Sequence, residues 1–560
     1  MGMNGLKGCL ARLSAIAFGV LAFGSAAAAD VRFDGTTTLQ AALDAGAGGR
    51  VTIAKGVWEV DPGFVRNGTE IVFEEGAELV ANPKGFFGID DCVLSVWAQT
   101  NVVIRGGTIR MHRQDYLDKK DGRPRSQHRQ GLSLRGAVNV RVEDMEFYEC
   151  GGDAIYVANA GRAPCRNIVI RRSLMSRGLR QGMSVIDVDG LLIEDCTLER
   201  SLGENPQAGI DFEPNQPWQR LKGIVMRNSR LQDNARNGID IYVVNFDDTT
   251  EPVDMLFENC TTVSNRTGFG LSMNRRYGYP RGRVVVSNCL FRANREQAIN
   301  IGQKPAGCLA LEIVDTRIED SCRELPERGD IHLLSRYAWD NPPDDILFRN
   351  VAVVQSRKGP WIVWENPGFG PKPMANIRGE VAVTDPDGRT VRHTLSAATC
   401  AELMPRPAGG PVVPETVRWE KMCPAAYGGL RELAPVYARG RQHFVFYVDR
   451  GRRVSFEGGI KGNAWTSWRP TEKPGKIEFR KLGCKKWKRE RLADVALPVC
   501  RGGFSFEAPS EGWYVMTLDS SKSGFYLYAS EVPAWLSLEK KVPLDPAVPC
   551  IALDPKEVRL

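Results

Sequence analysis

The chain has 560 residues, of which 25% are charged and 42% hydrophobic, and its formal net charge is +7 at pH 7. This length is enough for one large domain and a smaller one. The basic excess is mild and excludes the dense positive stripe of a nucleic-acid-binding protein. The basic run at 485–491 (KKWKRER) is interpreted as a solvated strand face.

Residues 1–29 are typical of an export signal rather than of a folded segment. Lys7 and Arg12 precede an apolar run at 13–24, and small residues at 26–29 resemble a cleavage site before Asp30. The run is too short to span a membrane, and no later run is long enough. We therefore predict a secreted or periplasmic protein without a membrane span.

The sequence has 14 cysteines, and an exported chain meets conditions in which disulfides persist. Four of them occupy like positions in the repeats described below and are interpreted as buried small side chains: Cys150, Cys196, Cys260 and Cys289. Three closer pairs are candidate disulfides: Cys308 with Cys322, Cys400 with Cys423, and Cys484 with Cys500. No paired CxxC spacing is present, so a zinc site is not expected.

Residues 36–46 (TTTLQAALDAG) are predicted to form a short amphipathic helix, followed by alternating strands at 50–60 and 69–81. A helix at this position would cover the open end of a stack of strands.

From Asn101 onward, the chain repeats a unit of strand, polar turn and strand. The first strands of the units begin, mostly 23 to 35 residues apart, at Asn101, Asn139, Asn167, Gly190, Gly223, Asp254, Arg283, Ala310 and Asp345. A phrase of the form glycine, apolar, any residue, apolar follows in most units, as in GIDFE and GIDIY. The turn positions are expected to form a hydrogen-bonded ladder: Asp195, Asn228, Asn259, Asn288 and Asn350. Units with two strands leave no room for a helix, which excludes the α-solenoids.

This pattern predicts an all-β fold, a right-handed parallel β-helix over residues 30–366. It resembles the pectin-lyase-like superfamily of exported polysaccharide lyases and glycoside hydrolases. The resemblance implies action on carbohydrate. The chain carries no pectate-lyase signature, and the polygalacturonase motifs NTD, DD, GHG and RIK are absent.

Beyond residue 366 the repeats fade. A β-hairpin with a DPDG turn is predicted at 375–391, and residues 404–415 are rich in proline and glycine. Short aromatic-rich strands then predict a β-sandwich, with Trp465, Trp468, Trp487 and Trp513 as candidates for core packing or sugar stacking. The expected division is a hairpin and linker at 367–432, an accessory domain at 433–532 and a tail at 533–560.

Two near-copies of one phrase, AGIDFEPN at 208–215 and NGIDIYVVN at 237–245, begin 29 residues apart. Alternation places the apolar residues inward, and Asp211, Glu213 and Asp240 outward. On neighbouring rungs, Asp211 and Asp240 would lie roughly 5 Å apart, Asp211 and Glu213 roughly 7 Å, and Glu213 and Asp240 roughly 8 Å. One outer column is expected to read Ser133, Ala154, Ser184, Asp211, Asp240, Gly270 and Asn300. The next is expected to read Arg135, Tyr156, Ile186, Glu213, Tyr242, Ser272 and Gly302.

A protonated acid beside a carboxylate that activates water is the arrangement that glycoside hydrolysis requires, at roughly 6.5–9.5 Å for inversion. We therefore hypothesise an exported glycoside hydrolase, without a cofactor, that acts on a polysaccharide or oligosaccharide. Uronate-containing glycans are among the candidate substrates. Asp240 would be the acid, and Asp211 and Glu213 would hold the water. The expected substrate contacts are Tyr156, Tyr242, Asn245, Arg275, Arg276, His128 and Arg135.

Two other interpretations stay open. Asp211, Glu213 and Asp240 could hold Ca²⁺, with Arg275 or Arg276 removing a proton beside a uronate carboxylate, which is lyase chemistry. The third interpretation is a non-catalytic glycan-binding β-helix. The sequence indicates neither the sugar nor the oligomeric state.

Overall fold

The structure is a computed structural model. It describes the following residues: 29–117, 122–273, 279–304, 307–334, 344–365, 376–396, 399, 431–449, 451–461, 476–481, 494–496, 502–531, 535–537 and 550–551. The chain splits into two compact units. The first comprises residues up to 334 together with 341–365 and 373–405, and the second comprises the remainder. Residues 1–28 of the export signal predicted at 1–29 lie outside the described residues. In the described part of the chain, no helix is long and apolar enough to cross a membrane.

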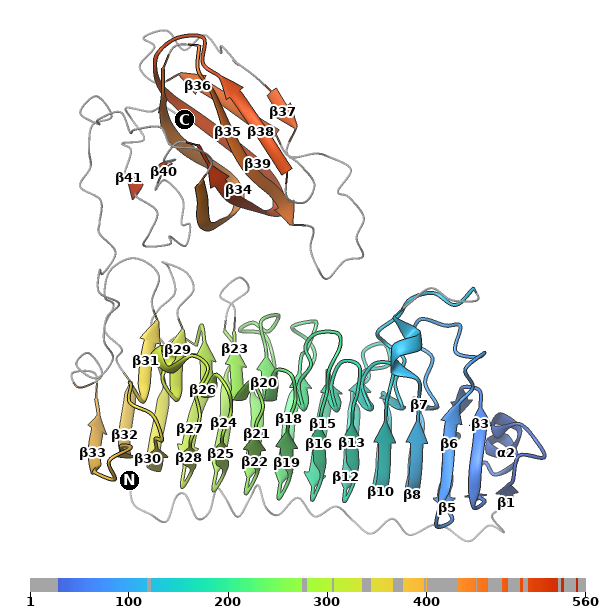
Figure 1. Ribbon diagram of the computed structural model, residues 1–560. Helices are drawn as coiled ribbons and strands as arrows, with labels where there is room; N and C mark the ends of the chain where they lie inside the picture. Colours follow the sequence, from blue (N-terminus) through green and yellow to red (C-terminus); the bar gives the residue numbers. More distant parts are fainter. Residues whose placement is uncertain are drawn as a thin grey trace. The chain divides into compact units, whose positions relative to one another are not determined.

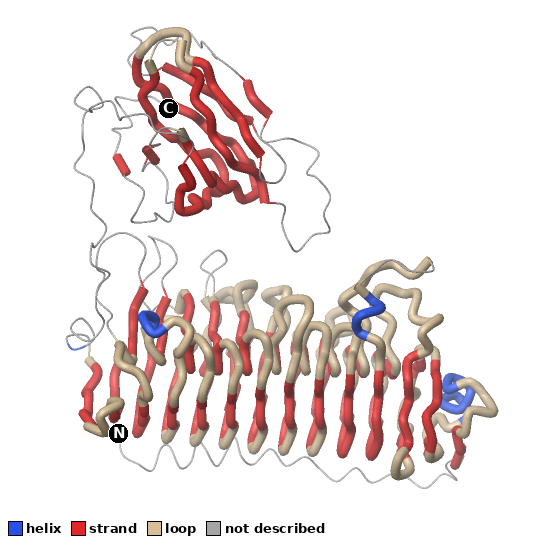
Figure 2. The backbone as a smooth tube through the Cα atoms, in the orientation of Figure 1, coloured by secondary structure: helices blue, strands red, loops and turns tan. Residues whose placement is uncertain are grey.

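The first unit is a coil of parallel strands with three faces (Figures 1 and 2). The first face consists of β1 (Asp30–Phe33), β2 (Arg50–Ile53), β5 (Glu70–Phe73), β8 (Thr100–Arg110), β10 (Val138–Tyr148), β12 (Cys165–Arg171), β15 (Val188–Glu194), β18 (Leu221–Arg227), β21 (Val253–Glu258), β24 (Gly282–Ser287), β27 (Ala310–Val314), β30 (Ile346–Val354) and β32 (Ile377–Thr384). The second face continues from the long strands β8, β10, β30 and β32 and adds β3 (Gly56–Val60), β6 (Ala77–Ala81), β13 (Leu174–Ser176), β16 (Thr197–Glu199), β19 (Arg230–Gln232), β22 (Thr261–Val263), β25 (Leu290–Arg292) and β28 (Arg317–Glu319).

The third face is a separate 11-stranded sheet. It consists of β4 (Gly63–Phe64), β7 (Leu94–Trp97), β9 (Leu132–Arg135), β11 (Ile155–Ala158), β14 (Met183–Val185), β17 (Ile210–Phe212), β20 (Asn237–Tyr242), β23 (Thr267–Ser272), β26 (Gln297–Gly302), β29 (Ile331–Leu334) and β31 (Ile362–Glu365). Every pairing in this sheet is parallel, as a coil requires. The predicted parallel β-helix is therefore confirmed.

The predicted N-terminal helix is confirmed as α2 (Leu39–Ala45). The hydroxyl of Thr38 caps it by accepting a hydrogen bond from the Ala41 amide at 3.2 Å. Leu39, Ala42 and Leu43 are buried, and the helix contacts β1 and β4 at the end of the stack (Figure 1). It therefore covers apolar side chains that the first rung would otherwise expose to water.

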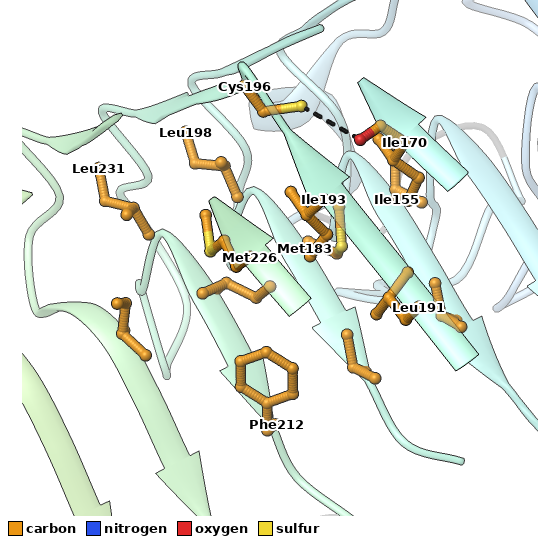
Figure 3. Packing of buried hydrophobic residues seen from close by; sticks show 14 of the residues in the cluster. Ile155, Ile170, Met183, Leu191, Ile193, Cys196, Leu198, Phe212, Met226 and Leu231 are labelled. Carbon is orange, nitrogen blue, oxygen red and sulfur yellow. Dashed lines mark hydrogen bonds between the residues drawn. The ribbon is translucent and has the colours of Figure 1, made fainter. Parts of the chain in front are cut away.

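The core lies inside the coil, where inward side chains of successive rungs stack on one another. Figure 3 shows these layers meeting between the faces, with Ile155, Met183 and Phe212 from one sheet and Ile170, Ile193 and Met226 from the other. The repeat cysteines Cys150, Cys196, Cys260 and Cys289 are buried in this core, as predicted.

The predicted disulfide between Cys308 and Cys322 is wrong. Cys308 precedes β27 and lies beside Lys304, whereas Cys322 follows β28. The two strands between the cysteines carry their thiols to different corners of the coil. The other candidate pairs, Cys400 with Cys423 and Cys484 with Cys500, lie outside the described residues.

The corners of the coil use residues that tolerate a left-handed backbone. Asn228, Asn259 and Asn288 have φ values of 52°, 54° and 52°, which asparagine adopts more readily than most residues. Their side chains form the predicted ladder, because Asn259 donates to Asn228 at 2.7 Å and Asn288 donates to Asn259 at 3.4 Å.

A second ladder, inside the coil, was not predicted. Asn234, Asn265 and Asn294 are completely buried. Asn234 donates through Nδ2 to Asn265 at 2.9 Å, and Asn265 donates to the Leu231 carbonyl at 2.9 Å. These amides satisfy backbone groups at a corner that water does not reach.

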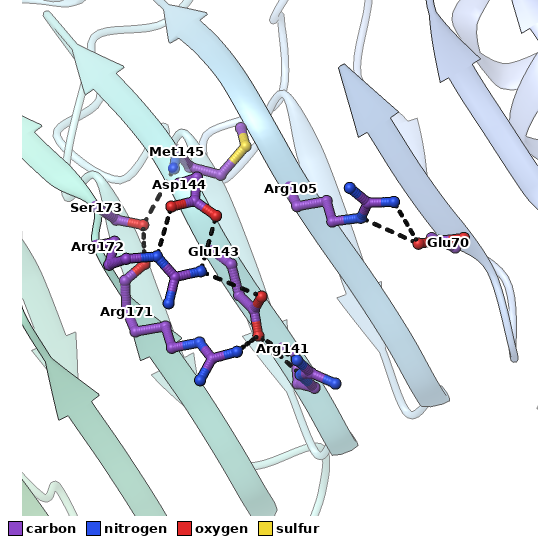
Figure 4. Close-up of polar contacts among 9 residues, drawn as sticks. All are labelled: Glu70, Arg105, Arg141, Glu143, Asp144, Met145, Arg171, Arg172 and Ser173. Carbon is purple, nitrogen blue, oxygen red and sulfur yellow. Dashed lines mark hydrogen bonds and ion pairs between the residues drawn. The ribbon is translucent and has the colours of Figure 1, made fainter. Parts of the chain in front are cut away.

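On the outer surface, the first face carries ion pairs between rungs (Figure 4). Glu143 lies 2.6 Å from Arg141, 3.0 Å from Arg171 and 3.5 Å from Arg172. Burial opposes ionisation of Glu143, but hydrogen bonds from Arg141 and Arg171 prevail and lower its pKa.

The described β-helix continues past residue 366. Strand β32 pairs in parallel with β30, and β33 (Thr390–Leu395) pairs antiparallel with β32. The predicted hairpin therefore forms, and it extends the 22-stranded sheet.

The second unit is an 8-stranded sheet system, almost entirely antiparallel. Its strands are β34 (Arg431–Val448), β35 (Arg453–Lys461), β36 (Lys476–Lys481), β37 (Asp494–Ala496), β38 (Gly502–Glu507), β39 (Gly512–Ser530), β40 (Trp535–Ser537) and β41 (Cys550–Ile551). The first half of β39 pairs with β36 and the second half with β35, so this strand serves two half-sheets around an aromatic core that includes Phe446, Phe456 and Phe479. The predicted β-sandwich is confirmed, with two of its expected strands joined as β39. The side chains of Trp465, Trp468, Trp487 and Trp513 lie outside the described part.

Candidate active site

The 11-stranded sheet presents an outward column of side chains fixed by the strand register. Along it lie Ser95, Ser133, Tyr156, Ser184, Asp211, Asp240, Gly270, Asn300 and His332. The predicted column is correct except at β11, where Tyr156 and not Ala154 faces outward. Ala154 occupies the position that Gly131 and Gly182 hold before the neighbouring strands, so Tyr156 belongs to the first column and Ala158 takes its place in the second.

Five strands of this sheet have a glycine immediately before their first inward side chain, and this glycine has a steric cause. A Cβ atom on any of the five glycines would approach a carbonyl oxygen of the next rung to 2.6–2.9 Å: Gly131, Gly182, Gly209, Gly238 and Gly268. Neighbouring turns therefore come closest at this corner, which explains why the repeated phrase begins with glycine.

Asp211, Glu213 and Asp240 come together as predicted. Asp211 and Asp240 are directly paired on β17 and β20, and adjacent strands lie about 4.8 Å apart. Glu213 follows β17, and its amide donates to the Val185 carbonyl at 3.1 Å. Asp211 is 1% exposed, the Glu213 side chain is 14% exposed, and Asp240 is half-buried. The three carboxyl groups thus form one cluster on the outer side of the sheet.

Two further charged residues, neither of them predicted from the sequence, complete this cluster. The Arg180 guanidinium lies 3.7 Å from Asp153 Oδ2 and 3.9 Å from Glu213 Oε2. Asp153 is completely buried and accepts a hydrogen bond from Ser184 Oγ at 2.8 Å. Both residues precede their strands in the turns, where the strand periodicity gives no signal.

Burial governs the protonation of the cluster. It raises the pKa of Asp211 well above its ordinary value, and the nearby charges of Glu213 and Asp240 raise it further, against the effect of Arg180. Burial likewise raises the pKa of Glu213, opposed by Arg180 and by a hydrogen bond from Asp211. The pKa of Asp240 is raised to about 6 by burial, opposed by a hydrogen bond from Asn237 and by Arg236. Protonated and ionised carboxyl groups therefore coexist near neutral pH.

Asp240 has room because the next rung carries a glycine. A Cβ atom on Gly270 would lie 2.7 Å from Asn237 Nδ2 and 3.0 Å from Asp240 Oδ1. The missing side chain of Gly270 leaves the space that Asn237 and the Asp240 carboxylate occupy.

Tyr156, Arg135 and His128 lie on the same face as the cluster. The Arg135 guanidinium lies 4.8 Å from the Tyr156 ring and 5.6 Å from the ring of Trp97, which was not among the predicted contacts. Partial burial lowers the pKa of His128 to about 4, assisted by the charges of Arg180 and Arg135. His128 is therefore neutral at pH 7.

The other predicted substrate contacts have different outcomes in the structure. Tyr242 is exposed in the second column, beside Ser272. Asn245 donates its amide to the Pro214 carbonyl at 3.1 Å, which gives it a structural role. Arg275 and Arg276 lie outside the described residues.

The cluster is a poor match to a calcium site. The Arg180 guanidinium already supplies positive charge to Asp153 and Glu213. Among the described residues, no group of three or more Asp, Glu, His or Cys side chains is arranged to hold a metal ion.

Residues 91–251 match the family model described as a right-handed β-helix region. The predicted right-handed parallel β-helix is thereby confirmed. Two uncharacterised Bacillus subtilis (strain 168) proteins are similar to part of the chain. The SPbeta prophage-derived protein YorA is 31% identical over 156 residues, 26% of each chain, and YclG is 30% identical over 161 residues, 27% of each chain. The matched segment thus spans about a quarter of each relative.

Solved structures with similar coils include three of different kinds. The Yersinia enterocolitica family 28 exopolygalacturonase is 13% identical with a TM-score of 0.45, covering 64% of this chain and 79% of that one. A capsular polysaccharide depolymerase, tailspike gp49 of Acinetobacter baumannii bacteriophage Fri1, is 10% identical with a TM-score of 0.40, covering 90% and 83%. The Streptococcus pneumoniae surface adhesin PfbA is 12% identical with a TM-score of 0.38, covering 62% and 86%. At this level of likeness they do not decide the activity of this chain.

Proposed function

We propose that the protein is an exported glycoside hydrolase that cleaves a polysaccharide or oligosaccharide with inversion. The observation that carries this proposal is the cluster of Asp211, Glu213 and Asp240 on adjacent rungs, with Arg180 against it. A glycosidic bond needs a proton for its leaving oxygen and a carboxylate that activates water. A buried group of like charges supplies both protonation states at once.

Each acid suits a different role. Asp240 is half-buried and can meet substrate, and its pKa of about 6 keeps it protonated under mildly acidic conditions, so we assign it as the general acid. Glu213 lies 3.9 Å from the Arg180 guanidinium, whose positive charge favours the ionised carboxylate, so we assign Glu213 as the base that activates water. Asp211 is buried between them and donates a hydrogen bond to Glu213, so we assign it to hold the water and the base in place.

The expected geometry favours inversion. Glu213 lies two residues along and one rung away from Asp240, and such diagonal neighbours are separated by roughly 7–8 Å. Inverting enzymes hold their acid and base roughly 6.5–9.5 Å apart, which leaves room for a water molecule.

The test is a screen of the purified full-length chain on plant, algal and bacterial polysaccharides, with and without EDTA. Release of reducing ends in EDTA is expected, and Asp240→Asn and Glu213→Gln should each lower turnover about 10²–10⁴-fold. The matched control is Asp189→Asn, on the outer surface of β15 in the other sheet. Undiminished turnover in both site variants would overturn the assignment.

The same screen separates the alternatives. A product with the ultraviolet absorbance of an unsaturated uronate, formed only with Ca²⁺, would indicate a lyase. Binding of a glycan without any cleavage would indicate a non-catalytic glycan-binding protein.

A further inference from the structure

Beside the carboxylate cluster, the outer surface of the 11-stranded sheet carries an aromatic and basic patch. It consists of Trp97 on β7, Arg135 on β9 and Tyr156 on β11, and we call it the shelf. Trp97 and Arg135 are direct register partners, and Tyr156 pairs with Ser133, two residues before Arg135. The guanidinium lies 5.6 Å from the Trp97 ring and 4.8 Å from the Tyr156 ring.

The shelf is accessible to a ligand. Trp97 is 50% exposed, which is unusual for a side chain with so large an apolar surface. The Arg135 side chain is 23% exposed, and Tyr156 is half-buried. The shelf therefore offers a flat aromatic surface and a partly exposed guanidinium, both of which water now contacts.

Arg135 is only weakly paired by the protein itself. Its Nε donates to Ser133 Oγ at 3.2 Å, and its ion pair with Asp90 is 4.0 Å long, to a carboxylate that is 57% exposed. The nearby His128 is neutral at pH 7, and the charge of Arg180 also acts on that ring. An anionic group would therefore find a guanidinium whose only protein carboxylate among the described residues, that of Asp90, is 4.0 Å away and exposed.

A comparable pair elsewhere on the coil shows the difference. Arg110 lies 4.8 Å from the Tyr148 ring on the first sheet, but its Nε is 2.6 Å from Glu78. That arginine has a close protein carboxylate, whereas Arg135 has a distant one. An arginine that stacks on a tyrosine is therefore not always free to bind an anionic ligand, because a protein carboxylate can already pair with it.

One rung, on β14, separates Tyr156 of the shelf from Asp211 of the carboxylate cluster. The rung between Tyr156 and Asp211 carries Ser184 in the first column and Ile186 in the second, and both are buried. From Arg135 on β9 to Asp211 on β17 there are three rung steps, or roughly 14 Å. A single extended chain of several sugar rings is long enough to reach both sites.

We propose that the shelf is a remote subsite that binds an anionic sugar of the chain cleaved at the carboxylate cluster. This inference rests on the proposed function. Trp97 would stack on the apolar face of the sugar ring, and Arg135 would pair with its carboxylate or sulfate. The substrate class is then an acidic polysaccharide, and oligosaccharides too short to reach the shelf are poor substrates.

The first test measures binding to the full-length Asp240→Asn variant, which leaves the glycan intact, by titration calorimetry. The probes are polygalacturonate and alginate as carboxylated chains, carrageenan as a sulfated chain, and carboxyl-reduced polygalacturonate as a neutral chain. We expect Arg135→Met to weaken binding of the preferred anionic probe about tenfold or more and to leave the neutral probe unchanged. Trp97→Ala should weaken both, Arg135→Lys should restore part of the loss, and the control Arg110→Met should change neither.

The second test measures cleavage in the otherwise unaltered protein, with oligosaccharides of increasing length. In Arg135→Met, KM should rise several-fold for long substrates and stay unchanged for short ones. Circular dichroism and thermal unfolding will verify that each variant is folded.

The outcomes separate this inference from the proposed function. If the protein cleaves a glycan and the shelf variants leave binding and KM unchanged, the shelf proposal is overturned while the hydrolase stands. If nothing is cleaved but Arg135→Met weakens binding of an anionic glycan, the binding site stands and the hydrolase is overturned. If no anionic probe binds, the shelf proposal is likewise overturned.

Discussion

Replacement of Asn237 by alanine is expected to move the alkaline limit of activity toward higher pH. Burial raises the pKa of Asp240 to about 6, and the hydrogen bond from Asn237 opposes that rise because it stabilises the charged carboxylate. A hydrogen bond to a charged group contributes about 1.5–3 kcal/mol, and one pKa unit corresponds to about 1.36 kcal/mol. Taking the lower end, because Asp240 is half-buried, the pKa should rise by about one unit.

The consequence for catalysis follows from the protonated fraction of the acid. With a pKa of about 6, roughly a tenth of Asp240 is protonated at pH 7; with a pKa of about 7, half is protonated, a gain of about fivefold. The assay is kcat/KM for release of reducing ends between pH 4 and 9, which reports the pKa values of the free enzyme.

The matched control is Asn82→Ala, which removes a 3.0 Å hydrogen bond from an asparagine to Asp61 away from the cluster. Its profile should coincide with that of the unaltered protein. An alkaline limit that stays in place in a folded Asn237→Ala variant, or that moves to lower pH, would refute the assignment of Asp240 as the acid.

Three other outcomes are expected. Gly270→Ser should lower kcat at least tenfold without a comparable loss of melting temperature, because its Cβ would displace Asp240, whereas Gly302→Ser, whose Cβ meets nothing closer than 3.4 Å, should keep activity. Asp211→Asn should raise the melting temperature at pH 7.5 but not at pH 4. The pKa of Asp211 is raised in the folded protein, so its contribution to stability is present below the unfolded pKa and is lost as the pH rises through the folded pKa. Asparagine does not titrate, so the variant does not suffer this loss. Asn265→Ala should destabilise the coil by about 2–4 kcal/mol in denaturant titration, because it leaves buried backbone groups without partners. An unchanged kcat in Gly270→Ser would contradict the first expectation, and an equal change of melting temperature at both pH values in Asp211→Asn would contradict the second. A loss of stability below about 1 kcal/mol in Asn265→Ala would contradict the third.

The fold was predictable because each rung repeats the same physical problem. Inward positions such as Ile210, Phe212 and Ile239 must be apolar, and corner positions such as Asn228 must tolerate a left-handed backbone. These constraints recur with every unit, so the sequence shows them many times.

The buried polar residues of the site were not predictable in the same way. Asp153 and Arg180 lie in turns of irregular length, and nothing in the local sequence shows that Arg180 meets both Asp153 and Glu213 across the rungs. Trp97 was overlooked for a related reason. It ends a strand with a regular pattern, and only the register with Arg135 shows that it lies exposed beside an arginine.

The apolar core beneath the cluster keeps its carboxylates close to one another despite their mutual repulsion. A shift of one residue in the register would separate Asp211 from Asp240, but it would also turn Ile210 and Phe212 outward into water. Burying such side chains contributes about 1.5–3 kcal/mol each, so the fold opposes that shift and keeps the acids one rung apart. The raised pKa of Asp240 is therefore a property of the rigid stack. A substitution that loosened the core near Phe212, without contact with a carboxylate, would let water reach the cluster and lower the pKa of Asp240. The alkaline limit of activity would then move to lower pH, which is opposite to the effect expected of Asn237→Ala.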